Sequence, residues 1–92
     1  MEKIKKVFEI YNDKISNKFE IIEYTSEYII VQIKQSFGFM PVFFRIFIED
    51  DEIVMQMQDK RNFDYYMKRS LNFRNNDKGL EEMLVYLIDV FS

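Results

Sequence analysis

The sequence predicts an α+β domain in which an N-terminal helix and a C-terminal helix flank an antiparallel sheet of four to five strands. Apolar residues recur at helical spacing at both ends of the chain and alternate with a period of two between them. The composition, 48% hydrophobic and 17% aromatic, is typical of a globular protein and not of a disordered one. Because 92 residues can form one ordinary core, we expect residues 1–92 to be a single compact domain.

An amphipathic helix is predicted over residues 2–17. Its apolar residues form a stripe along one face, and lysine, asparagine and aspartate residues occupy the remaining faces, as expected for a helix packed on a core. The apolar stripe consists of Ile4, Val7, Phe8, Tyr11 and Ile15.

Four strands are predicted after this helix, over residues 19–24, 27–35, 40–48 and 53–58. Pro41 is compatible with the start or the edge of a strand. The acidic run 49–52 separates the third strand from the fourth, and so short a polar connection indicates a hairpin.

Residues 63–73 fit either a fifth strand or a helix. Their aromatic content and the four-residue connection before them slightly favour a strand. Asp64 near the start and Lys68 with Arg69 near the end would suit a helix dipole, so both interpretations stay open.

The last element predicted is a helix from Leu80. Its apolar face consists of Leu80, Leu84, Leu87, Ile88 and Phe91. Asp77, three residues earlier, is a candidate for the residue that caps its first turn.

The residue types argue against catalysis. Histidine and cysteine are absent, which removes the most common general base, the thiol nucleophile and the best transition-metal ligands. The two glycines, Gly38 and Gly79, are too far apart to form a phosphate-binding loop. We therefore expect no enzyme activity and no cofactor. The acidic run 49–52 lacks the ligand spacing of a calcium loop, so we expect a solvated turn and no metal.

The chain is predicted to be cytoplasmic. No segment approaches the roughly 20 apolar residues of a membrane-spanning helix, and residues 1–6 lead into an amphipathic segment rather than a signal core. We expect no interaction with membranes.

Nucleic-acid binding is the weaker of two binding hypotheses. Basic residues are interleaved with aromatic ones in the segment 60–74, a combination that lets bases stack while cations contact phosphates. The net charge of −3 opposes the binding of a polyanion. The candidate residues are Lys60, Arg61, Lys68, Arg69 and Arg74.

Protein binding is favoured because the predicted sheet is apolar on both faces. The second and third strands place branched and aromatic residues on both sides. If one helix covers each face, both are buried. If the two helices share a face, the other becomes an aromatic protein-binding patch made of Tyr28, Ile30, Phe43 and Phe47, with Tyr66 as a further member.

The function expected from these features is a non-enzymatic protein-binding module, acting either as a homodimer or as an inhibitor or adaptor on a larger partner. The chain is rich in Ile, Lys, Asn, Phe and Tyr and has no alanine, a bias typical of AT-rich genomes. In size, acidity and composition it resembles the inhibitors of host defence proteins, anti-CRISPR proteins among them, that phages and mobile elements encode. A homodimeric chaperone-like domain is a further alternative.

Overall fold

The computed structural model describes residues 1–15, 18–33, 42–58 and 69–91, and it confirms the α+β fold. In chain order the elements are α1 (Glu2–Lys14), β1 (Phe19–Tyr24), β2 (Tyr28–Ile33), β3 (Val42–Glu49), β4 (Glu52–Gln58), β5 (Arg69–Arg74) and α3 (Asp77–Phe91).

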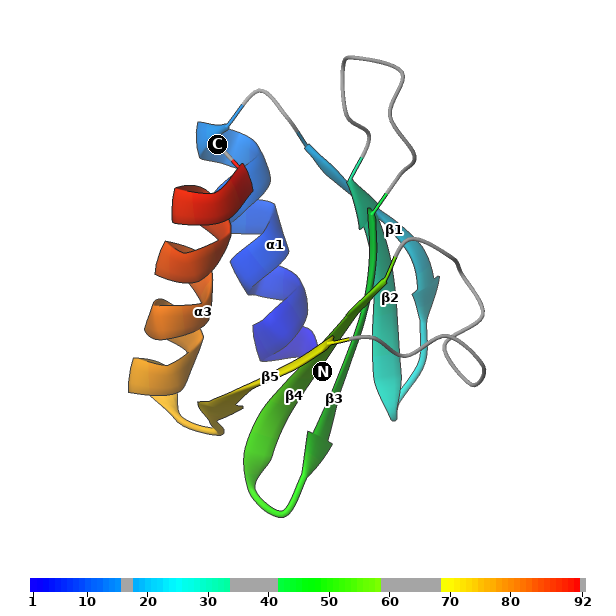
Figure 1. Ribbon diagram of the computed structural model, residues 1–92, viewed down its shortest axis with the longest axis vertical. Coiled ribbons are helices and arrows are strands. Elements are labelled where there is room, and N and C mark those ends of the chain that lie inside the picture. The colour runs from blue at the N-terminus through cyan, green and yellow to red at the C-terminus, as the bar shows by residue number, and fades with distance from the viewer. Residues whose placement is uncertain (16–17, 34–41, 59–68, 92) are drawn as a thin grey trace.

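The five strands form one antiparallel sheet in the order β1-β2-β3-β4-β5, so each strand pairs with its neighbour in the sequence (Figure 1). The predicted hairpin between β3 and β4 is present. Its two central residues, Asp50 and Asp51, have φ angles of 52° and 60°, as a two-residue hairpin of this type requires. The acidic run 49–52 is thus the end of this hairpin.

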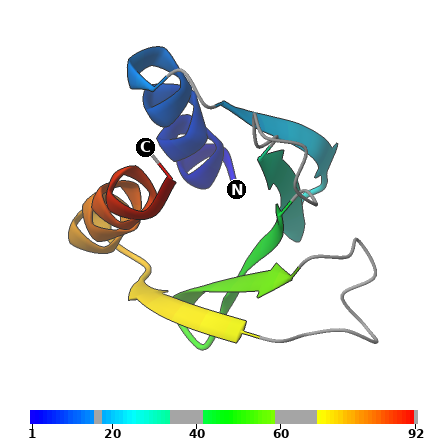
Figure 2. The same ribbon diagram turned by 45° about the horizontal axis from the view of Figure 1, so that its top comes forward.

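Both helices lie on the same face of the sheet (Figure 2). We call this the helix face and the opposite one the outer face. The interpretation with one of these two helices on each face is therefore wrong, and among the described elements no helix lies on the outer face. The two helices described are amphipathic, and neither is long and apolar enough to cross a membrane.

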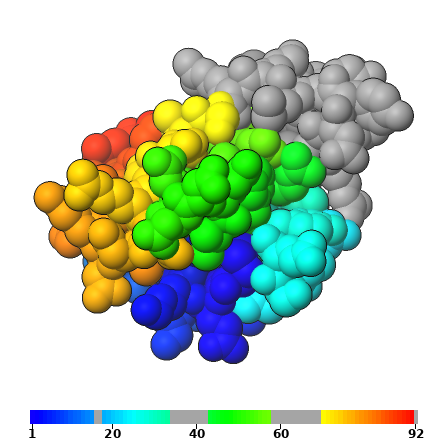
Figure 3. All heavy atoms as spheres, turned by 90° about the horizontal axis from the view of Figure 1, so that it is seen from below, coloured from blue at the N-terminus to red at the C-terminus, as the bar shows by residue number. Residues whose placement is uncertain are grey.

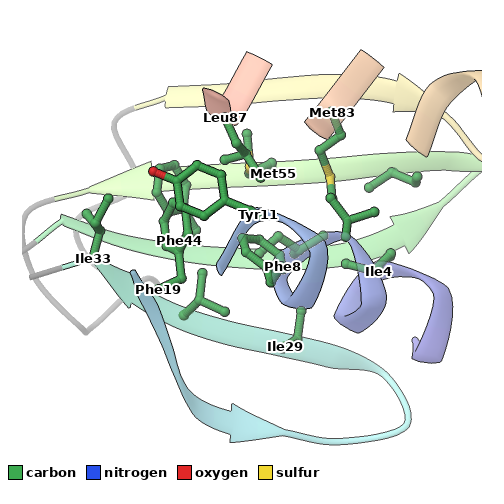
Figure 4. Close-up of a cluster of buried hydrophobic side chains, with 14 residues drawn as sticks. Ile4, Phe8, Tyr11, Phe19, Ile29, Ile33, Phe44, Met55, Met83 and Leu87 are labelled. Atoms are coloured by element: carbon green, nitrogen blue, oxygen red, sulfur yellow. The ribbon is translucent and has the colours of Figure 1, made fainter. Parts of the chain in front are cut away.

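The core between the helices and the sheet is built around aromatic rings (Figure 4). Phe19 of β1 contacts four other rings with centroids 4.8–5.7 Å away, those of Phe8, Tyr11, Phe44 and Phe91. Because these rings come from α1, β3 and α3, Phe19 joins both helices to the sheet. Its own side chain is 4% exposed.

Helix α1 ends three residues before the predicted boundary at residue 17. Ile15 is already extended, with φ −119° and ψ 138°. The Asn12 side chain holds the start of β1: its Nδ2 donates to the Phe19 carbonyl over 2.9 Å, and the Phe19 N–H donates to its Oδ1 over 2.8 Å. This pair of hydrogen bonds joins the last turn of α1 to the start of β1.

Helix α3 begins at Asp77 rather than Leu80, and the prediction that Asp77 caps it is wrong. The Gly79 N–H donates to Asn76 Oδ1 over 2.8 Å, which makes Asn76 the N-cap. The acidic side chain of Asp77 lies in the first turn, where the helix dipole favours it.

The second half of the ambiguous segment 63–73 is a strand. Leu71 and Phe73 of β5 pack against the core, as the strand interpretation predicted, and Phe73 lies 6.1 Å from the Tyr86 ring. Residues 63–68 lie outside the described residues.

Tyr11 carries a buried hydroxyl that has no partner among the described residues. Its side chain is fully buried, its hydroxyl makes no hydrogen bond with any residue that the structure describes, and burial raises the pKa of this phenol. We expect Tyr11→Phe to raise the free energy of unfolding by about 1 kcal/mol or more, because an unsatisfied buried hydroxyl is removed. Chemical denaturation at neutral pH measures this, and lower stability of the variant would contradict it.

The same group predicts a dependence on pH. In the unfolded chain Tyr11 loses its proton near pH 10, whereas the folded chain retains it at higher pH. Ionisation of Tyr11 therefore does not change the free energy of unfolding below pH 10. Above pH 10 it lowers the free energy of unfolding as the pH rises. The free energy of unfolding of Tyr11→Phe should fall less steeply than that of the wild type in that range.

Candidate functional site

The outer face presents its side chains in rows that cross the sheet. The strand register pairs each outward residue with one on the next strand. One row runs Tyr28, Phe47, Val54, Asn72, and the row beside it runs Ile30, Arg45, Gln56, Ser70.

The predicted aromatic patch is only partly accessible. Tyr28, Phe43 and Phe47 are half-buried, while Ile30 is 6% exposed. Ile30 pairs in register with Glu23 on β1 and with Arg45 on β3, and the side chains of both partners are half-buried. The predicted contact residue Ile30 therefore belongs to the floor of this face rather than to its accessible surface.

Arg45 is held in place at the centre of the face. Its Nε and Nη2 donate to Gln56 Oε1 over 2.9 and 2.7 Å, and its guanidinium carbon lies 5.7 Å from the centroid of the Phe47 ring. Both contacts restrict the side chains involved, and the second is a cation–π interaction. Arg45 and Phe47 thus form an ordered pair.

Tyr28, which pairs in register with Phe47, interacts with the acidic side chain of Glu23. A hydrogen bond with the Glu23 carboxylate raises the pKa of the Tyr28 phenol; partial desolvation and the negative charges of Glu23 and Glu27 add to this, and the positive charge of Arg45 opposes it. The Tyr28 phenol is therefore protonated at neutral pH and can donate to the Glu23 carboxylate.

Two depressions flank Phe47. One, of about 550 Å³, is lined by residues of β2, β3, the turn before β2 and the N-terminus, namely Met1, Ser26, Glu27, Tyr28, Arg45, Phe47 and Ile48. The other, of about 330 Å³, lies towards β5 and is lined by Phe47, Glu49, Asp50, Glu52, Val54, Gln56, Ser70 and Asn72. Figure 3 views this end of the molecule, with the β3–β4 hairpin (green) beside the β1–β2 turn (cyan). We call Tyr28, Arg45 and Phe47, with these two depressions, the Phe47 site.

Ile48 is a residue of this region that sequence reasoning missed. Its place in the alternation predicts a core position, yet it is 42% exposed. The pairing between β2 and β3 ends at Phe47, so β3 runs past β2 and leaves Ile48 at an open edge beside Met1. No pattern within the strand could have indicated this, because it depends on the length of the neighbouring strand.

Among the alternative nucleic-acid residues, the structure describes the side chain of Arg74 alone. Lys60, Arg61 and Lys68 lie outside the described residues, as does Tyr66 of the aromatic patch, and of Arg69 only the backbone is described. Arg74 is exposed and pairs in register with Glu52 across β4 and β5.

Within the described ranges, no group of three or more acidic side chains is arranged to hold a metal ion. No protein-family model matches the sequence, and neither the curated proteins nor the solved structures contain a match.

Proposed function

We propose that this protein is a non-enzymatic protein-binding module that acts in the cytoplasm and docks its outer sheet face on a basic surface of a larger protein. The observation that carries the proposal is the Phe47 site, in which a partly accessible tyrosine and phenylalanine surround a fixed arginine. Tyrosine, phenylalanine and arginine are enriched in protein interfaces, and tyrosine and arginine dominate binding energies.

The charge around the site supports a basic partner. Carboxylates lie on both sides of Phe47: Glu27 lines one depression, and Glu49, Asp50 and Glu52 line the other. A lysine or arginine of the partner can pack its aliphatic stem against the Phe47 ring and extend its charge to these carboxylates. Such complementarity speeds association and selects the partner.

Inhibition of a host defence protein fits this chemistry. Proteins that act on nucleic acid carry basic surfaces for the phosphates, and a defence nuclease of a phage-infected bacterium is one such protein. An acidic module of net charge −3 that occupies a basic surface would compete with the nucleic acid. We therefore propose that the protein is an inhibitor encoded by a phage or mobile element.

The test uses the full chain as bait for a displayed library of random peptides. We expect selected peptides to carry lysine or arginine next to an aromatic or aliphatic residue. Phe47→Ala should weaken their binding by about 30-fold or more, the loss typical of a binding hot spot. Titration calorimetry of a synthetic peptide measures the change.

Val90→Ala is the matched control, because Val90 is 51% exposed and lies on α3, away from the outer face. It should bind like the wild type, and circular dichroism should show that both variants fold. If no peptide is enriched, or if Phe47→Ala binds as tightly as Val90→Ala, the proposal is wrong.

A further inference from the structure

A second apolar surface lies on the opposite side of the molecule, between α1 and α3. It is a groove of about 370 Å³ whose floor and walls are formed by Val7 and Ile10 of α1 and by Leu80 and Leu84 of α3. Ile10 is 42% exposed, although it is a large apolar side chain on a helix. The proposed outer-face function does not use this groove.

The two walls of the groove carry opposite charges. Lys3 and Lys6 line it on α1, and Asp77 and Glu81 line it on α3, and all four side chains are exposed. Neither lysine forms an ion pair with another residue in the described part of the chain. Both lie near the N-terminus of α1, where the helix dipole disfavours cations. An external negative charge would stabilise them there.

The helices run in the same direction, which fixes how charges would meet in a symmetric pair (Figure 1). Tyr11 and Phe91, near the C-terminal ends of α1 and α3, both contact Phe19, and Lys3 and Asp77, near the N-terminal ends, line the same groove. Consider a twofold axis that runs parallel to the two helices, above the groove. Rotation about it places α1 of one copy against α3 of the other, with the N-terminal ends of both helices at the same height.

We propose that a second copy of this chain packs on the groove between α1 and α3 about this axis. Lys3 and Lys6 of each copy then face Asp77 and Glu81 of the other, and the apolar side chains of the two grooves meet between them. The charge pattern is complementary to itself under this rotation, as a twofold interface requires.

The size of the helix layer sets the expected affinity. Helices of 13 and 15 residues are roughly 20 Å long, and two of them side by side are roughly 20 Å wide. This footprint is about 400 Å² per copy, or roughly 800 Å² in total, which is below the roughly 1,200 Å² of stable protein interfaces. We therefore expect a weak dimer that dissociates at about 0.1 mM or above. Both Phe47 sites stay open on the outside of the dimer, which makes the module bivalent.

Sedimentation equilibrium of the full chain from about 1 µM to 1 mM tests the dimer. The mass should approach twice the 11.4 kDa of one chain as the concentration rises. Ile10→Glu should weaken the dimer by about 30-fold or more, whereas Val90→Glu, at a somewhat more exposed position outside the groove, should leave it unchanged. A wild type that is monomeric throughout, or equal effects of both variants, would overturn the inference.

A charge exchange tests the arrangement of the helices. Lys3→Glu with Lys6→Glu makes both walls acidic, and Asp77→Lys with Glu81→Lys makes both walls basic, so each variant alone should be monomeric. An equal mixture should form a heterodimer, because each α1 then faces an α3 of opposite charge. Circular dichroism verifies that both fold. Failure of the mixture to associate would refute this geometry and leave the Phe47 proposal untouched, whereas a dimer disrupted only by Phe47→Ala would refute the groove as the dimer interface.

Discussion

Gly79→Ala is expected to lower the free energy of unfolding by about 3 kcal/mol or more. Helix propensity alone predicts the opposite sign, because alanine is favoured over glycine inside a helix by roughly 1 kcal/mol. A Cβ at Gly79 would lie 1.8 Å from the carbonyl oxygen of Arg74, and a backbone atom cannot move aside as a flexible side chain can. The start of α3 would have to separate from the end of β5.

Urea denaturation of Gly79→Ala beside Lys78→Ala measures this effect. Lys78 is exposed in the same turn, so its substitution should change stability by no more than about 0.5 kcal/mol. If Gly79→Ala is as stable as the wild type, the close approach of α3 to β5 is wrong.

Phe19→Ala is expected to cost about 4 kcal/mol of folding free energy. Truncation of a buried phenylalanine typically costs about 3–5 kcal/mol, and here four ring contacts are lost together. Because small domains are stable by only about 5–15 kcal/mol, the variant should be close to unfolding at room temperature.

Phe19→Leu separates the loss of volume from the loss of rings. It keeps most of the apolar bulk and should cost clearly less than Phe19→Ala in thermal unfolding followed by circular dichroism. Equal costs of the two variants would show that the rings around Phe19 contribute more than the filled space does.

The core of the sheet could be predicted from the sequence because alternation depends only on the strand itself. Ile29 and Val31 on β2, and Phe44 and Ile46 on β3, are all fully buried on the helix face, as their alternation predicts. Ile48 breaks the rule because its burial depends on how far β2 extends.

The candidate site could be predicted only in outline. Alternation places Tyr28 and Phe47 on one face, and the register makes them direct neighbours. The hydrogen bond from Arg45 to Gln56 depends on the register of β3 and β4, and the effect of Glu23 on the pKa of Tyr28 depends on a bulge in β1; the sequence pattern reveals neither feature. The hydrogen bonds of Asn12 and Asn76 could not be predicted for the same reason, because the partner of a polar side chain depends on the folded structure.

The packing of α1 against α3 joins the two ends of the chain, whereas every strand pairs with its neighbour in sequence. During synthesis the sheet can therefore assemble hairpin by hairpin from local contacts, which form quickly. Helix α1 is synthesised before the sheet but must wait for α3, which is synthesised after the sheet, before it can complete its packing. Until then much of the apolar helix face stays uncovered, and the nascent chain is most prone to aggregate in this interval.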